Sequence, residues 1–329
     1  MYLALDSHEK EIANAAVTFL GKEFPLERLH GEHRDSNRLS EFSKLGWLGL
    51  SAPDSVGGSG LSIVEEMLFF LEMGRIAGPV GVLTQILAVA AAQSEPDTCR
   101  RLINGEAQVA LVVEQDSQGK IRLVGDDNAG YALAVSPRSA TLFELDISAC
   151  REVPCLDRSV KMYVGADSAL KPVVQRPGDE VWLKAQIDVS AMMIGIAERA
   201  LNMIVAYAKE RQTFGRPIGA YQAVRHPCAD MAVRIEVARC QLFFAATAMK
   251  EGQADAAMQI DAARLVAERA ARENTDSNIQ LHGGIGVTDE FSAHLLLKRA
   301  NLLWRLLGSS KINMKSLLEP GGEVTKERG

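Results

Sequence analysis

The sequence has few aromatic residues, no cysteine pairing pattern and no basic run, and each absence narrows what the chain can do. Phe, Trp and Tyr make up 5% of its 329 residues. The five cysteines are odd in number and lack metal-ligand spacing, so we expect reduced thiols. The formal net charge is −6 and Lys and Arg are not clustered, so nucleic acid is not an expected partner.

Long uncharged apolar runs and a targeting pattern are also missing. No stretch of 18 or more uncharged apolar residues is present, which argues against a membrane span. The N-terminal residues, MYLALDSHEKEI, carry acids where a signal peptide carries basic and then apolar residues. We therefore expect a cytoplasmic protein.

The chain has enough hydrophobic residues to form several cores. Its composition also changes twice along the sequence, near residues 108 and 182. Hydrophobic residues make up 47%, and the length suits two or three domains. Residues 1–107 contain several short segments with apolar residues at helical spacing, which predict an N-terminal α-helical domain. Residues 108–181 contain β-branched runs broken by turn residues, and they predict a small antiparallel β middle domain.

The C-terminal half returns to helical periodicity. Residues 182–318 contain four long apolar segments with short connections, which predict a four-helix bundle. These segments cover 188–212, 221–250, 256–280 and 292–318, and the last could break near Gly308. Residues 319–329 form a polar tail. The predicted fold class is therefore mainly α with a small β middle domain.

The turn after the first bundle segment, RQTFGRPIGAYQ, is the first candidate for a binding site. Arg211 lies at a predicted helix end beside Gly215 and Pro217, which punctuate helices. A guanidinium next to exposed backbone groups suits an anionic ligand. The alternative is that Arg211 only complements the helix dipole and the last carbonyl groups.

A second candidate, QLHGGIGVTDEF, is a glycine turn between two predicted helices. Gly283, Gly284 and Gly286 would let a phosphate approach backbone N–H groups closely. The turn lacks the Lys-Ser/Thr of a Walker loop, and no strand precedes it as in a dinucleotide-binding turn. A plain helix–helix connection is the alternative interpretation.

Together, these two stretches resemble the acyl-CoA dehydrogenase family. That family carries R-x-x-F-G-x-x-I-x-x-x-Q ending in A-D-M, and later Q-x-x-G-G-x-G-x-x-x-E. The N-terminal segment LGWLGLSAPDSVGGSGLSIVEE is similar to that family as well. The residues that match the two motifs are Arg211, Phe214, Gly215, Ile218, Gln222, Ala229, Asp230 and Met231, then Gln280, Gly283, Gly284, Gly286 and Glu290.

The resemblance implies an enzyme that introduces a double bond next to an acyl-CoA thioester, with FAD as cofactor. A carboxylate base removes the α proton while FAD takes the β hydride. An electron-transferring flavoprotein is the family's usual acceptor. The cofactor-binding residues implied are Arg211, Phe214, Gln222, Gln280, Gly283 and Gly284, with the glycine turn reaching the FAD of a neighbouring subunit.

The chain departs from the family where the base and the flavin ring would be held. The Y-E-G-T/S segment that carries the base falls on residues 306–309, so the base position is Leu307. In other members the base begins the first bundle helix, a register that falls on Ala185. Neither residue accepts a proton. The ring-holding segments T-E-P-x-x-G-S-D and W-x-T/S are also missing.

Three interpretations stay open on the sequence. The first is a base-lacking subunit of an α2β2 heterotetramer whose partner supplies the glutamate, with steroid or lipid degradation as the expected setting. The second is a homodimeric or larger homo-oligomeric enzyme with a relocated base, such as Asp289 or Glu290. The third is a non-catalytic relative that acts as a binding or scaffold protein.

Overall fold

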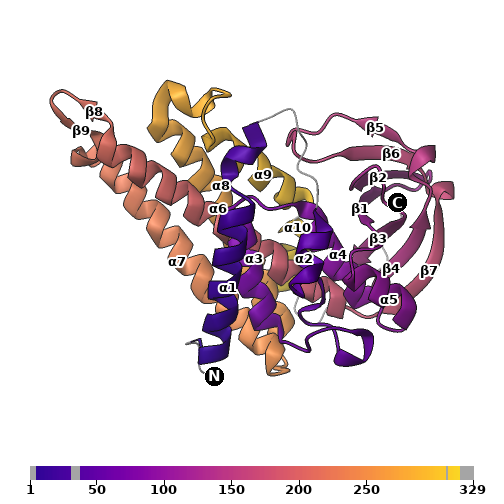
Figure 1. Cartoon of the computed structure of the whole chain (residues 1–329). Coiled ribbons are helices and arrows are strands. Elements are labelled where there is room, and N and C mark those ends of the chain that lie inside the picture. The colour runs from indigo at the N-terminus through magenta and orange to yellow at the C-terminus, as the bar shows by residue number, and fades with distance from the viewer. Residues whose placement is uncertain (1–4, 31–37, 309, 319–329) are drawn as a thin grey trace.

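The computed structural model describes residues 5–30, 38–308 and 310–318, so the predicted tail at 319–329 lies outside the described residues. Figure 1 shows three parts in sequence order: short helices at the centre, a curved sheet on one side, and long helices that project on the other. This arrangement confirms the predicted fold class of a mainly helical chain with a β region in the middle.

The first part is a layer of short helices, two of which begin at a side-chain cap. Asp6 and Glu9 form a reciprocal capping box at α1, and Ser62 and Glu65 form another at α3. The short 3₁₀ turn η1, Leu26–His30, follows α1. The helices are α1 Ser7–Glu23, α2 Leu39–Lys44, α3 Ile63–Arg75, α4 Val80–Ala91 and α5 Pro96–Ile103.

The second part is a seven-stranded sheet in the order β5-β6-β2-β1-β3-β4-β7. All strand pairs are antiparallel except β1 and β3, which run parallel with Val109 opposite Tyr131. The expectation of a purely antiparallel sheet is corrected here, because β3 follows β2 in the chain but adds to the free edge of β1. The strands are β1 Val109–Gln115, β2 Lys120–Val124, β3 Tyr131–Ser136, β4 Ser139–Leu145, β5 Arg151–Val153, β6 Met162–Ala166 and β7 Leu170–Pro177.

Two of these strands did not show in the sequence. β5 has only three residues, too few for an alternating pattern. β7 contains Pro172 and Pro177, and proline in a run argues against a strand unless the strand lies at an edge. β5 and β7 are the two edges of this sheet, which explains how both are accommodated.

The third part consists of three long helices and two shorter ones at the C-terminal side. The break expected near Gly308 is present, because α9 ends at Arg305 and α10 begins at Ser310. The first helix begins at residue 180 rather than 188, since its charged first turns find partners inside the fold. The helices are α6 Glu180–Glu210, α7 Gln222–Lys250, α8 Ala256–His282, α9 Ala293–Arg305 and α10 Ser310–Leu318.

Helix α6 is the central helix of the molecule. It crosses α3 so closely that a Cβ atom on Gly74 would overlap the Met192 carbonyl, and one on Gly195 would overlap the Leu71 carbonyl. By length and mean hydropathy, 1.4 in its most apolar window, α6 could cross a membrane. That window is 67% buried among the neighbouring helices of this fold, which accounts for its apolar composition.

Candidate functional site

The far end of α6 leads into a small hairpin that projects from the bundle (Figure 1). Strands β8, Gln212–Thr213, and β9, Arg216–Pro217, are joined by Phe214 and Gly215. Both central residues have positive φ, 49° and 78°, which is the geometry of a type I′ hairpin turn. The sequence showed a turn here but not the hairpin, because two-residue strands leave no periodicity.

Three predicted cofactor residues lie on or beside this hairpin. Arg211 caps α6, and its backbone N–H donates to the Tyr207 carbonyl at 2.9 Å. Its guanidinium is exposed and forms no ion pair with the described residues. Phe214 is 98% exposed at the hairpin tip, and Gln222 is exposed as the first residue of α7. These side chains are therefore available to a ligand that arrives from outside the chain.

The glycine turn follows the last residue of α8. Gly283 has a φ of 64°, and neither Gly283 nor Gly284 has a heavy atom within 4 Å of a Cβ position. Gln280, the third predicted residue of this turn, is exposed. The backbone here is open enough for a phosphate group to approach closely.

An aromatic contact joins the glycine turn to the end of α6. The His282 ring lies between Tyr207 and Phe291, with ring centroids 4.5 Å and 4.6 Å away. His282 Nδ1 lies 2.7 Å from the Asn278 carbonyl, and burial lowers the pKa of the imidazole. Because Tyr207 is one turn before Arg211, the two motifs lie at the same end of the bundle. The sequence did not indicate Tyr207 or His282 as the contact between them.

The two positions where the family places its base lie together at the opposite end of α6. Ala185 is fully buried and Leu307 is 5% exposed. Gln186 Nε2 donates to the Leu307 carbonyl at 3.0 Å. Leu307 adopts a left-handed backbone conformation with a φ of 58°, and Trp182 packs against the following turn. The structure therefore brings the two positions side by side, but neither side chain can take a proton.

A buried arginine holds the carbonyl groups that precede Leu307. Arg264 is fully enclosed, and its Nη2 donates to the carbonyls of Leu303 at 3.2 Å and Leu306 at 3.3 Å. Burial lowers the pKa of this guanidinium to about 10. A cation at this position satisfies the free carbonyl groups at the C-terminal end of α9.

Charged groups are also buried one turn from Ala185. Lys184 forms an ion pair with Glu66 of α3 and donates to Ser51 Oγ at 2.8 Å. Asp188 is fully buried beside Glu66, and burial followed by the Glu66 charge raises the pKa of its carboxyl well above the usual range. These carboxyl groups are enclosed between α3 and α6, so they are part of the packing rather than of an open site.

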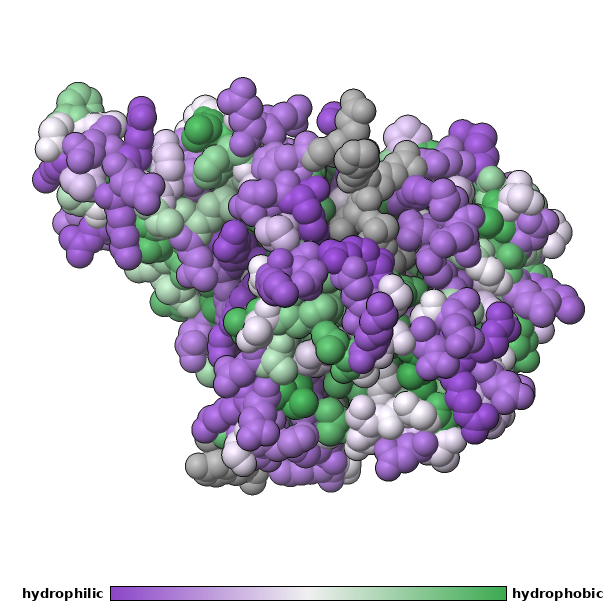
Figure 2. Space-filling model, in the orientation of Figure 1, coloured by the Kyte–Doolittle hydropathy of each residue, from purple (hydrophilic) through white to green (hydrophobic). Residues whose placement is uncertain are grey.

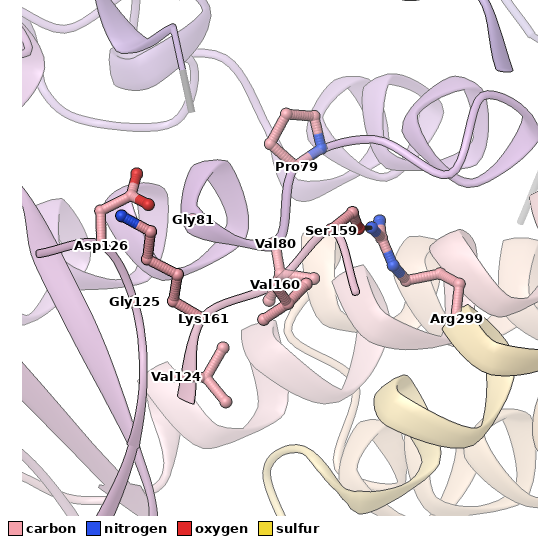
Figure 3. Close-up of a pocket in the computed structure, with 10 residues that line it drawn as sticks. All are labelled: Pro79, Val80, Gly81, Val124, Gly125, Asp126, Ser159, Val160, Lys161 and Arg299. Atoms are coloured by element: carbon pink, nitrogen blue, oxygen red, sulfur yellow. Dashed lines mark hydrogen bonds between the residues drawn. The ribbon is translucent and has the colours of Figure 1, made fainter. Parts of the chain in front are cut away.

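A small hollow lies where the sheet, α4 and α9 meet, and Figure 3 shows its lining. Arg299 is its buried corner, and it donates to Ser159 Oγ at 2.7 Å and to the Ala77 carbonyl at 2.7 Å. The space inside is about 20 Å³, room for one water molecule. The lining residues are Pro79, Val80, Gly81, Val124, Gly125, Asp126, Ser159, Val160, Lys161 and Arg299.

FAD, the cofactor that the resemblance implies, was compared with two places in the structure: the hairpin with the glycine turn, and the hollow at Arg299. A free guanidinium, an exposed amide and an open glycine turn suit the diphosphate of FAD. The hollow at Arg299 does not accommodate an isoalloxazine ring, because it holds about one water. The residues present at the hairpin and the glycine turn therefore fit the diphosphate of FAD.

Comparison with known proteins gives matches at both ends of the chain. The family described as "Acyl-CoA dehydrogenase, N-terminal domain" matches residues 6–94, and "Acyl-CoA dehydrogenase, C-terminal domain" matches residues 184–320. The acyl-CoA dehydrogenase IpdE2 of Mycobacterium tuberculosis is 32% identical over 278 residues, which cover 83% of each protein. The middle of the chain, where the sequence resembled the family least, lies between the two family matches.

Solved structures show the same fold at lower identity. A chain of the ChsE4-ChsE5 complex from Mycobacterium tuberculosis has a TM-score of 0.82 and 20% identity, over 98% of this chain and all of that chain. A chain of the Tcur3481-Tcur3483 steroid ACAD has a TM-score of 0.78 and 22% identity, over 94% of this chain and 96% of that chain. The predicted family and fold are thus confirmed, and the chain belongs to the acyl-CoA dehydrogenases, flavoprotein oxidoreductases that act on CH–CH bonds with FAD as cofactor.

Proposed function

We propose that this chain is the FAD-contacting subunit of a heteromeric acyl-CoA dehydrogenase whose catalytic carboxylate is on a partner chain. The observation that carries the proposal is the contrast between the two ends of α6. The side chains of Arg211, Phe214 and Gln280 are exposed at one end, with no hydrogen bond or ion pair to the described residues. Leu307 and Ala185 are buried and apolar at the other.

In this proposal the chain binds and orients the cofactor, and the partner removes the proton. When bound, FAD supplies the hydride acceptor of the dehydrogenation. Arg211 pairs with the diphosphate charge, and the Gly283–Gly284 backbone allows it to approach closely. The partner's glutamate takes the α proton of the acyl-CoA thioester. An electron-transferring flavoprotein is the acceptor that we propose for the reduced flavin.

Exposed apolar side chains support an assembly through the projecting end. Figure 2 shows apolar residues among the hydrophilic ones along this arm of the molecule. Burying a side chain of this size stabilises an interface by roughly 1.5–3 kcal/mol, so their exposure favours a partner surface. The exposed fractions are 98% for Phe214, 67% for Val287, 63% for Val233, 54% for Val237 and 41% for Ile285.

The similar proteins suggest both the assembly and the substrate class. One neighbour is a complex of two named chains, ChsE4 and ChsE5, and another is described as a steroid ACAD. We therefore propose an α2β2 heterotetramer that acts on a bulky, steroid-like acyl-CoA. We also propose a cytoplasmic location, in keeping with five free cysteines.

The test is the visible absorption spectrum of the chain, alone and after co-expression with its nearest Glu-bearing paralogue. The proposal expects a colourless chain that becomes yellow in the complex, with bleaching by an acyl-CoA only there. Replacing the partner's glutamate with glutamine should then abolish bleaching and keep the colour. A yellow chain that an acyl-CoA bleaches without a partner would overturn the proposal.

The second candidate is a homo-oligomeric enzyme with its base at Asp289 or Glu290. Both residues are exposed after the glycine turn, and the Asp289 side chain is 81% exposed. A proton-abstracting carboxylate works in a water-excluded site, which these positions provide only if another subunit covers them. Bleaching by the isolated chain that is lost in Asp289→Asn or Glu290→Gln would favour this candidate. A chain that stays colourless with every partner would favour a binding or scaffold role.

A further inference from the structure

A second hollow, separate from the predicted cofactor residues, lies where three parts of the chain meet. It is bordered by the end of η1, by the segment 157–159 before β6, and by the first turns of α9. Its space is about 110 Å³, enough for several waters or a small ion. The lining residues are Leu29, His30, Asp157, Arg158, Ser159, Asp289, His294, Leu295 and Lys298.

The charged side chains that line this hollow differ in whether they are paired. The Asp157 carboxylate is neutralised, because Arg299 Nε donates to its Oδ2 at 2.6 Å and Ser159 donates to its Oδ1 at 2.6 Å. Arg158 and Lys298 form no hydrogen bond or ion pair with the described residues. Two cations therefore line the space without a partner among the described residues, while the carboxylate of Asp157 beside them is already paired.

The two histidines of the hollow differ in how many of their ring nitrogens are hydrogen-bonded. His30 uses both ring nitrogens, with Nδ1 2.9 Å from the Asp289 carbonyl and Nε2 2.6 Å from Ser292 Oγ. His294 uses only Nδ1, which lies 2.8 Å from the Phe291 carbonyl and must be the protonated nitrogen there. His294 Nε2 is then an acceptor in the neutral ring, 3.6 Å from Asp289 Oδ1. It can donate to an anion only after it takes up a proton.

We propose that this hollow is a binding site for a tetrahedral dianion, a phosphate monoester or inorganic phosphate, held by Arg158, Lys298 and protonated His294. The ligand oxygens accept from the guanidinium and the ammonium group. One proton moves from solvent to His294 Nε2 on binding, so that both ring nitrogens donate.

The proton uptake follows from the surroundings of His294 in the free chain. Burial, and then the charge of Lys298, lower the pKa of His294. The other titratable or charged groups that face it are His30, Asp289, Asp157 and Arg158. A dianion in the hollow offsets the effect of Lys298, so it raises the pKa of His294 and binds more tightly as the pH falls.

The experiment uses the full chain and sulfate, which keeps its double charge between pH 6 and pH 8. Sulfate affinity is measured by isothermal titration calorimetry at constant ionic strength at both pH values. We expect binding at pH 6 and a loss of about tenfold or more at pH 8, which is about 1.4 kcal/mol. Sulfate should also raise the pKa of one of the chain's six histidines in NMR titrations, and His294→Gln should remove that signal.

Charge-matched variants distinguish sulfate binding in the hollow from nonspecific attraction of sulfate to the positive charges of the chain. Arg158→Gln combined with Lys298→Gln should weaken sulfate binding by about tenfold or more. The control pair Lys10→Gln and Lys44→Gln also removes two exposed charges and should change it less than about twofold. His294→Gln should keep binding but lose its pH dependence. Equal weakening in both pairs, a pH-independent affinity in the unmodified chain, or no sulfate binding would each overturn the proposal.

Competition experiments then identify the source of the dianion. Coenzyme A carries a terminal phosphate monoester that dephospho-coenzyme A lacks, so displacement of sulfate by the first alone would assign the site to that group. Displacement by inorganic phosphate alone would assign it to free phosphate. The site does not rest on the proposed function, since its residues are not those predicted to contact FAD.

Discussion

The two ends of α6 differ in how far their side chains are buried and in where those side chains find partners. At the first end, residues 182–188, nearly every side chain is buried, and Lys184 and Gln186 find their partners inside the fold. At the last end, the side chains of Arg211 and Phe214 are exposed and have no polar partner in the part of the chain that the structure describes.

The end of α6 near Leu307 is held by contacts within the chain. The turn at Leu307 and Gly308 has positive φ at both residues, 58° and 85°, although leucine pays a steric cost there. The turn is therefore maintained by the contacts of Gln186, Trp182 and Arg264. The first end is therefore packed within the chain, whereas the last end leaves Arg211 and Phe214 exposed.

The largest expected effect is on stability, and it comes from removing the buried charge of Lys184 near the first turn of α6. Lys184→Met leaves Glu66 buried without its ion-pair partner and should destabilise the fold by about 3–5 kcal/mol in urea unfolding. The matched control on the same helix is Lys209→Met, which is exposed and should change stability by less than about 0.5 kcal/mol. Similar midpoints for the two variants would remove the contrast between the ends.

The next effect depends on pH and involves Asp188. Because the folded-state pKa of this carboxyl is raised, its contribution to stability is fully present below the unfolded value of about 3.9 and is lost as pH rises through the folded value. Asp188→Asn cannot titrate. The variant should therefore gain stability relative to the unmodified chain between pH 4.5 and pH 7, measured by urea midpoints. Parallel pH profiles would show that Asp188 is ionised in the fold.

A smaller effect is expected at the exposed end, on cofactor retention rather than on folding. Arg211→Ala removes a cation that has no ion-pair partner among residues 5–30, 38–308 and 310–318, so the unfolding midpoint of the variant should stay unchanged. Flavin retained by the assembled protein should fall by about tenfold, since a diphosphate charge loses its partner. Lys209→Ala serves as the control for general charge. Unchanged flavin content in Arg211→Ala would remove this residue from the site.

The smallest effect is expected at the hairpin tip. Phe214→Ser exposes no core, because the ring is already 98% exposed, so stability should change by less than about 0.5 kcal/mol. The variant should weaken association with the partner, measured by sedimentation at several protein concentrations. An unfolding midpoint that falls strongly in the monomeric chain would mean that the ring packs within its own subunit.

Much of the architecture could be read from residue patterns. Apolar spacing located α7 and α8 to within about two residues, because long amphipathic helices repeat their signal over several turns. Short elements were missed for the opposite reason. The hairpin at Phe214 and the edge strands β5 and β7 are too brief, or too rich in proline, to produce a period.

The sequence by itself determined the family, the order of helical and β regions, the FAD-type motifs and the apolar residues at both base positions, since each is a matter of residue type and local spacing. Only the tertiary structure decided which residues meet. It placed Tyr207 against His282, joined Gln186 to Leu307 and enclosed Asp188 beside Glu66. Such contacts join residues far apart in the chain, and their geometry follows from how helices and strands pack rather than from any local pattern.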